Sequence, residues 1–372
     1  MNEDIKLSII IPIYNGENYI QSTIHSVLNS SYQNLEILLI DDGSTDHSLE
    51  LCQREADLDS RIKVYHKENE GIACTRNYGL RHASGEYIGF CDQDDEISCK
   101  MYTIMMHRII TDGSQAAICG CYRQKKNGRR VVFEKYTDTI LENPRSRNKL
   151  LLPMLFKGFA IYENHEAIIY PTIWNCIISR QLIEEKNMRF RSFVSYEDDL
   201  IMLFQLLLQA DKISTLSDIL YYWNTNVHSE IHRSAVRHLP DLEARQQNLI
   251  NYITDNLAKN NIAPKIIEQY TYVQQCRNAL LQLDNLAALN DRKTIHTLKM
   301  LRDCSSISYI CSAHNTVPSA KGFIRNTIII PLLRRKHIVA AYFMNHLINV
   351  IRFAVEKYQI TERLERRLKR TS

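Results

Sequence analysis

The sequence contains no apolar run long enough to cross a bilayer. The apolar stretches near its end, 327–333 and 338–351, are separated by the basic segment 334–337, and each is shorter than the roughly 20 residues that a spanning helix needs. The ten cysteines include no C-x-x-C pair, and no secretory leader stands out at the start. We therefore expect reduced thiols in a cytoplasmic protein, at most peripheral on the inner face of the cell membrane.

Two classes of protein lack their signatures here. A nicotinamide oxidoreductase needs G-x-G-x-x-G after its first strand, whereas the first apolar run of this chain is followed only by Gly16. A nucleic-acid partner is not expected, because the polar residues that follow the predicted strands are acidic rather than basic and aromatic. Hydrophobic residues make up 45% and charged residues 24% of the 372 residues, which is sufficient for a packed core and two domains.

The net charge of +4 is unevenly distributed along the chain. Residues 321–372 hold twelve Lys or Arg and three Glu, a net charge of +9, so the rest of the chain carries −5. A basic segment with bulky apolar residues at helical spacing is typical of helices that bind an anionic membrane surface. The alternative is a helical bundle that packs on the rest of the chain or forms a homo-oligomer.

The first part of the chain alternates apolar runs with amphipathic segments. The apolar runs predict strands at 7–14, 35–40, 62–66 and 87–91, and the amphipathic segments predict helices at 18–28, 46–56, 71–82 and 98–110. This alternation indicates βαβ units around a parallel sheet, in which ligands bind beyond the carboxyl ends of the strands. Further strands are expected at 116–122, 130–135, 212–216 and 219–223, and a helix at 197–209.

The sequence changes character beyond about residue 235. Gly322 is the only glycine after Gly158, and helical spacing dominates. It predicts helices at roughly 239–258, 263–289, 291–304, 322–334, 337–357 and 360–369. We therefore expect a catalytic domain over 1–234 and a helical C-terminal region over 235–372, which binds a membrane surface or mediates oligomerisation.

Polar side chains follow the first three predicted strands. Tyr14 can stack on a base, and either Asp41 or Asp42 can accept the imide N–H of a uracil or thymine. Gly71 lets a helix N-terminus approach an anion, and Arg76 lies one turn further along to offset its charge. Each motif alone is equally typical of a helix cap, an Asx turn or a glycine turn. Their order at successive strand ends favours a ligand site.

The fourth predicted strand ends in Asp92-Gln93-Asp94-Asp95, which places three carboxylates within four residues. Like charges at a strand end are costly unless a cation offsets them. Mg²⁺ and Mn²⁺ prefer oxygen ligands and are often shared between carboxylates and substrate phosphates. We therefore expect a metal-bound diphosphate at this edge of the sheet. The alternative is a solvated acidic loop.

Together these motifs resemble those of a known family. The segments Ser8–Asn15, Ile40–Asp46, Asn69–Gly79 and Phe90–Asp95 are similar in spacing and order to family-2 inverting glycosyltransferases of the GT-A fold. The resemblance covers about residues 5–225 and implies a Rossmann-like mixed α/β sheet, here with an α-helical C-terminal extension. It also implies sugar transfer from a nucleotide-diphosphate donor to a hydroxyl of a saccharide or lipid-linked saccharide acceptor, in cell-surface polysaccharide synthesis. A UDP-sugar is favoured, and thymidine is compatible with the same contacts.

The resemblance implies a role for each matching position. On the donor side the implied contacts are Pro12, Tyr14, Glu17, Asp42, Asn69, Arg76, Asp92 and Gln93. Mn²⁺ or Mg²⁺ would bind Asp94, with Asp92 touching the metal or the ribose. On the acceptor side the implied residues are Trp174, Asp95 and Glu197, with Asp95 facing the donor sugar. The alternative for Trp174 is a place in the core.

Inverting transfer needs a carboxylate that takes the proton of the acceptor hydroxyl. The segment Ser195–Leu200 opens a predicted helix and is similar to the family's Glu-Asp element, which implies that Asp198 is this base. Asp199 takes the role if the pair is read one position later, and acidic residues also favour a helix N-terminus without any catalytic role. A noncatalytic sugar- or nucleotide-binding scaffold of the same fold is the second hypothesis, and the carboxylates of Asp92, Asp94 and Asp198 argue against it.

Overall fold

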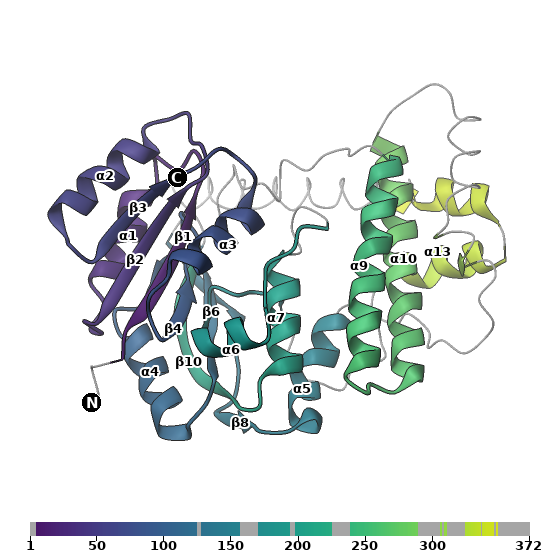
Figure 1. The fold of residues 1–372 in the computed structure, drawn as a ribbon. Helices are drawn as coiled ribbons and strands as arrows, with labels where there is room; N and C mark the ends of the chain where they lie inside the picture. Colours follow the sequence, from purple (N-terminus) through teal and green to yellow (C-terminus); the bar gives the residue numbers. More distant parts are fainter. Residues whose placement is uncertain are drawn as a thin grey trace, which may run out of the picture. The chain divides into compact units, whose positions relative to one another are not determined.

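The computed structural model describes residues 5–124, 128–156, 170–193, 198–224, 239–288, 324–335 and 337–345, with five further single residues between 306 and 348. Contacts divide the chain into two compact units, one of Met1–Lys157 and His165–Arg233 and one of Gly158–Asn164 and Ser234–Ser372 (Figure 1). The helices expected at 291–304 and 360–369 lie outside the described residues. The roles assigned to 1–234 and 235–372 stay predictions.

The first unit is built on a sheet whose first four strands are parallel. In sheet order these are β3 (Ile62–His66), β2 (Leu35–Asp41), β1 (Leu7–Ile13) and β4 (Tyr87–Phe90). The helices that connect them are α1 (Ile20–Leu28), α2 (Ser48–Leu58) and α3 (Ile72–His82). The predicted βαβ units are therefore confirmed, with ends that differ from the prediction by one or two residues.

Both faces of β1 are covered, which explains its unbroken apolar run. All of its residues are buried. Ile9 and Ile11 belong to one apolar cluster with side chains of α1, α2 and α4 (Met101–Asp112). On the other face, a Cβ at Gly79 of α3 would lie 2.5 Å from Ile10 Cγ2. Glycine at this position lets α3 lie close against β1, on the side of the sheet opposite α1 and α2 (Figure 1).

The second half of the sheet is mixed. β9 (Cys176–Ser179) lies between β4 and β6 (Ala116–Gln124) and runs antiparallel to both. β10 (Ile213–Asn224) is parallel to β6, and its pairing shifts register twice. One irregular strand therefore replaces the two strands that the sequence predicted at 212–216 and 219–223.

Shorter elements complete this unit. They are the strands β5 (Glu96–Ile97), β7 (Arg130–Glu134) and β8 (Thr139–Leu141) and the helices α5 (Pro144–Leu155), α6 (Arg180–Glu185) and α7 (Asp198–Gln209). The sequence did not predict β5, β8, β9 and α6, which have six residues or fewer and are too short to establish a period. Nor did it predict α5, whose pattern is interrupted by Pro153.

The described part of the second unit is helical. The helices α9 (Leu239–Lys259) and α10 (Pro264–Ala288) contact each other, and α13 (Ile324–Arg334) is followed by helical residues at 338–345. These elements confirm a helical C-terminal region. Within the ranges that the structure describes, no helix is both long and apolar enough to cross a membrane.

Candidate functional site

The carboxyl ends of the first strands meet at one edge of the sheet. The register places Ile13 of β1 beside Asp41 of β2, and Asp41 beside His66 of β3. On the other side of β1, β4 leads directly into the acidic segment Asp92–Asp95. The polar motifs of four separate loops are thus brought to one edge, as expected for a ligand site in such a sheet.

The loops that follow β1 and β2 are bonded to each other. Asn15 Oδ1 accepts a hydrogen bond from the N–H of Thr45 (2.8 Å). The N–H of Glu17 donates to Asp46 Oδ2 (3.1 Å), and Glu17 Oε2 accepts from the N–H of His47 (3.1 Å). The carboxylate of Glu17, an implied donor contact, therefore holds the start of α2 in this structure.

Tyr14 and Pro12 were both expected at a nucleoside, and their environments differ. Tyr14 is 41% exposed directly after β1, so its ring is accessible for stacking on a base. Pro12 is buried within β1 and pairs with Ile40. The side chain of Pro12 therefore packs inside the sheet, which differs from the pocket position that the resemblance implied.

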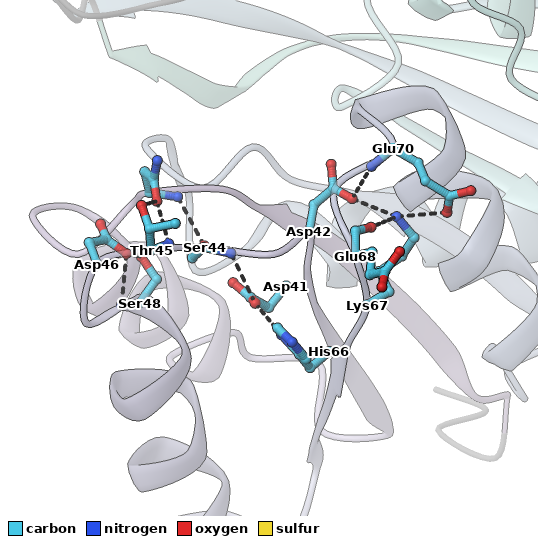
Figure 2. Close-up of polar contacts among 11 residues, drawn as sticks. Asp41, Asp42, Ser44, Thr45, Asp46, Ser48, His66, Lys67, Glu68 and Glu70 are labelled. Atoms are coloured by element: carbon cyan, nitrogen blue, oxygen red, sulfur yellow. Dashed lines mark hydrogen bonds and ion pairs between the residues drawn. The ribbon is translucent and has the colours of Figure 1, made fainter.

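Figure 2 shows the two aspartates at the end of β2, which have different partners. Asp41 is fully buried, its Oδ2 lies 2.7 Å from His66 Nδ1, and its Oδ1 has no hydrogen-bond partner in the described part of the chain. Asp42 Oδ1 accepts from the N–H of Glu70 (3.0 Å), and its Oδ2 accepts from the N–H of Gly71 (2.9 Å). Asp42 therefore fixes the loop that leads into α3.

Lys67 is a second determinant of this corner, and the sequence analysis missed it. Its Nζ donates to Asp42 Oδ1 (2.6 Å), to the carbonyl oxygen of Glu68 (2.5 Å) and to Glu70 Oε2 (2.9 Å), as Figure 2 shows. Burial disfavours the Asp42 carboxylate, but Lys67 and the backbone N–H groups outweigh it and lower the pKa of Asp42. Asp42 is therefore held ionised. Asn69, also an implied donor contact, is exposed on the same loop.

Gln93 joins the loop after β4 to the loop after β1. Its Oε1 accepts from the N–H of Tyr14 (2.9 Å) and its Nε2 donates to the carbonyl oxygen of Tyr14 (3.1 Å). A Cβ at Gly16 would clash with Gln93 Oε1, so glycine leaves the room that this amide needs. The Gln93 side chain is engaged by the main chain, whereas the resemblance implied a donor contact.

A buried arginine joins the acidic segment to the candidate base. Arg76 of α3 is 2% exposed, and its Nη1 donates to Asp198 Oδ2 (2.6 Å) and to Asp199 Oδ1, while its Nη2 donates to Asp92 Oδ1 (2.9 Å). Its Cζ lies 5.3 Å from the ring centroid of Phe190. Arg76 thus places one positive charge beside Asp92, and the expected metal ion at Asp94 and Asp92 stays a prediction.

The ionisable groups of this network shift one another's pKa values. Burial raises the pKa of Asp199 to about 7, although the charge of Arg76 opposes the rise and the charges of Asp198 and Asp92 add to it. Burial alone would lower the pKa of Arg76, but the three carboxylates raise it overall. Arg76 is therefore a permanent cation here, and Asp199 takes up a proton more easily than an ordinary aspartate.

Two residues expected on the acceptor side lie inside the protein. Asp95 is 1% exposed, and its oxygens accept from the O–H of Tyr221 (2.8 Å) and the N–H of Asn224 (2.8 Å). Trp174 is 5% exposed and stacks on Tyr221 with ring centroids 4.1 Å apart. Both side chains face protein, which differs from the implied acceptor contacts and, for Trp174, matches the core alternative. Glu197 lies outside the described residues.

Comparison with solved structures gives the fold. The chain is similar to residues 1–349 of S. aureus TarS, solved in complex with UDP-GlcNAc, with a TM-score of 0.62 and 21% identity, over 92% of this chain and 90% of that one. This likeness confirms the expected GT-A glycosyltransferase fold, a mixed α/β sheet with a helical C-terminal portion.

Comparison of sequences gives the family. The profile of glycosyl transferase family 2 matches residues 8–173. Glycosyltransferase GlyG of Streptococcus pneumoniae serotype 4 is 30% identical over 220 residues, which cover 58% of this chain and 70% of GlyG. Putative glycosyltransferase EpsH of Bacillus subtilis is 26% identical over 311 residues, 82% of this chain and 83% of EpsH. The chain belongs to glycosyl transferase family 2.

Some relatives extend well beyond the matched region. Uncharacterized glycosyltransferase EpsJ of Bacillus subtilis is 29% identical over 224 residues, which cover 60% of this chain and 62% of EpsJ. The chain thus spans less than two thirds of the length of this relative.

Proposed function

We propose that the protein catalyses metal-dependent, inverting transfer of a sugar from a nucleotide-diphosphate donor, with UDP favoured, to a hydroxyl of a saccharide or lipid-linked saccharide acceptor. One observation carries this proposal. The acidic segment after β4 and the N-terminus of α7 both contact the guanidinium of Arg76. The carboxylates of Asp92 and Asp198 both bond to Arg76 (2.9 and 2.6 Å). A donor-side and an acceptor-side carboxylate are thus within reach of one substrate.

The donor side of the site suits a pyrimidine nucleotide. The exposed ring of Tyr14 offers a stacking surface, and the ionised carboxylate of Asp42 can accept the imide N–H of a uracil. Cytosine lacks that N–H, so the same contact would discriminate against it. TarS, which has this fold, has been solved with UDP-GlcNAc and with UDP, and this supports a uridine donor.

The acidic segment has the ligand chemistry for a hard cation. Its side chains offer carboxylate oxygens, and Mg²⁺ typically binds one or two carboxylates together with substrate phosphates. In the described ranges no group of three His, Cys, Asp or Glu side chains is arranged to hold a metal. Because it offers carboxylate oxygens, the segment suits a metal shared with the diphosphate, with Asp94 as the principal ligand and Asp92 in support. Bound there, Mn²⁺ or Mg²⁺ would offset the charge of the leaving diphosphate.

The acceptor side supplies the base. Asp198 is 6% exposed at the start of α7, and Arg76 holds its Oδ2, which leaves Oδ1 as the oxygen to take the proton. The acceptor hydroxyl gives its proton to Asp198, and the acceptor oxygen attacks the anomeric carbon. The bond from that carbon to the diphosphate oxygen then breaks. Attack opposite the leaving group inverts the anomeric centre.

A nucleotide screen tests this proposal. We expect UDP to raise the melting temperature of the protein more than GDP or CMP, and Mn²⁺ to increase the effect. A panel of UDP-sugars and dTDP-sugars should then give release of the nucleoside diphosphate with at least one donor. The proposal is wrong if no nucleoside diphosphate binds. Binding of a sugar nucleotide without any turnover, with a range of saccharide acceptors, would instead favour the noncatalytic scaffold.

For the C-terminal region we propose contact with an anionic membrane, which would place the enzyme at the inner face of the cell membrane near a lipid-linked acceptor in polysaccharide synthesis. Val339, Phe343 and Leu347 are four residues apart and are 50%, 56% and 50% exposed, so they form an apolar stripe on a helical segment. The sequence around them is strongly basic.

Liposome flotation tests the membrane contact. The double variant Phe343→Asp/Leu347→Asp should float less with anionic vesicles than the unchanged chain, whereas the control Ile110→Asp, which alters an exposed apolar residue of the first unit (42% exposed), should float equally. Equal flotation of all three proteins would remove the membrane proposal. A smaller assembly of the double variant in gel filtration would then favour the homo-oligomer.

A further inference from the structure

Arg76 has an unusual environment for a residue expected to bind substrate. It is 2% exposed, and its terminal nitrogens donate to Asp198, Asp199 and Asp92. The ring of Phe190 lies beside it, with 5.3 Å between Cζ and the ring centroid. Only Nε lacks a hydrogen-bond partner among the described residues, and this atom is itself buried.

This environment argues against Arg76 as a ligand of the diphosphate. A phosphate oxygen would have to displace the carboxylates that already hold Nη1 and Nη2. Displacing them would leave buried carboxylates without their cation, which is costly. A planar guanidinium with a forked set of donors is, in contrast, well suited to fix several carboxylates at once.

We propose that Arg76 is a positioning residue that sets the carboxylate of Asp198 relative to that of Asp92, and so aligns the acceptor-side base with the donor-side acidic segment. This inference rests on the proposed function. Arg76 comes from α3, Asp92 from the loop after β4 and Asp198 from α7, so one side chain links three elements. Asp199 is the third carboxylate bonded to Arg76, so this cluster holds more acidic groups than basic ones.

The substitution Arg76→Lys tests this role, because lysine keeps the charge but has one terminal nitrogen, which cannot take the separate positions of Nη1 and Nη2 between Asp198 and Asp92. With the UDP-sugar found in the donor screen, we expect kcat to fall about 100-fold, the typical effect of misplacing a reacting group by about 1 Å. The Kd of UDP should change less than about threefold, because the diphosphate is not bound by Arg76. Arg81→Lys is the matched control, since Arg81 is an exposed arginine of the same helix, and should leave both constants unchanged.

The opposite pattern would overturn the inference. If Arg76 binds the diphosphate, Arg76→Lys will weaken UDP at least about tenfold, while uridine, which lacks the diphosphate, will bind as before. A variant with an unchanged kcat would equally refute the positioning role.

A stability measurement separates this inference from the proposed function. Arg76→Met leaves three carboxylates without their cation and should lower the melting temperature. Adding Asp199→Asn removes one of these charges and should restore part of the loss. Absence of this rescue would contradict the proposed network even in an active enzyme. A wild-type protein that binds no nucleotide would refute the proposed function, while the rescue could still be measured.

Discussion

The assignment of the base can be tested with two neighbouring substitutions, Asp198→Asn and Asp199→Asn. Both side chains bond to Nη1 of Arg76, so each change removes one carboxylate from the same cation. Only Asp198 is proposed to take the acceptor proton. Loss of a general base typically costs about 10²–10⁴-fold in rate, or about 3–5 kcal/mol of transition-state free energy.

Neither variant should lose much stability. Breaking a buried ion pair normally costs about 3–5 kcal/mol, because one charge is left uncompensated. Here Arg76 keeps two carboxylate partners after either change, and the cluster loses part of its excess negative charge. We therefore expect neither variant to lose more than about 1 kcal/mol in the free energy of unfolding, well below the usual cost.

The assay measures UDP release with donor and acceptor, the Kd of UDP by calorimetry, and unfolding in urea. Asp198→Asn should lose at least 99% of turnover and bind UDP nearly as the wild type does, whereas Asp199→Asn should lose less than about 90%. Near-normal turnover in Asp198→Asn would refute the base assignment. If only Asp199→Asn is inactive, the base is Asp199. Unfolding of both variants would refute the charge argument.

Further predictions concern other parts of the first unit. Asp94→Ala should abolish the increase in UDP affinity that Mn²⁺ gives, measured by calorimetry, and should leave metal-free binding unchanged. The pKa of Asp199 is raised from the usual 3.8 to about 7, so its protonated form favours folding at low pH and this contribution is lost progressively as the pH rises from about 4 to about 7; the stability of Asp199→Asn relative to wild type should therefore increase over this range in urea unfolding. Although burial opposes it, hydrogen bonds lower the pKa of Glu36 in β2 to about 2, so Glu36→Gln should cost about 2 kcal/mol at pH 7, and this difference should fade as the pH falls from about 4.5 towards 2. Gly79→Val should lower the melting temperature, with a cost of about 1–3 kcal/mol, because its Cβ would meet Ile10 at 2.5 Å; a variant as stable as wild type would contradict the close approach of α3.

The sequence predicted the parts of the fold that rest on local patterns. The buried strands β1, β2 and β4 and the helices beside them follow from continuous apolar runs and helical periods, because these strands lie inside the sheet and are buried. The strand β9 was missed because its four residues, Cys176–Ser179, are too few to show a pattern. Its place between β4 and β6 depends on pairing between distant segments, which no local rule predicts.

The sequence predicted which residues belong to the candidate site more successfully than it predicted their contacts. The sequence identified Asp92, Arg76 and Asp198, but not that Arg76 bonds to both aspartates, since spacing along the chain gives no information on such pairing. It placed Asp95 towards a sugar, whereas the hydroxyl of Tyr221, far along the chain, bonds to it inside the protein. Sequence reasoning was therefore least informative for side chains whose partners lie on other helices, strands or loops.

The late strand at the centre of the sheet has a consequence for how the protein is made. As the chain leaves the ribosome, β1 to β4 emerge first and can associate, because they are close in sequence. The outer edge of β4 then stays open until the segment Cys176–Ser179 has been synthesised. An open strand edge can recruit strands from other nascent chains. Slow translation between β4 and β9 should therefore lower the yield of native protein more than an equal pause after β10.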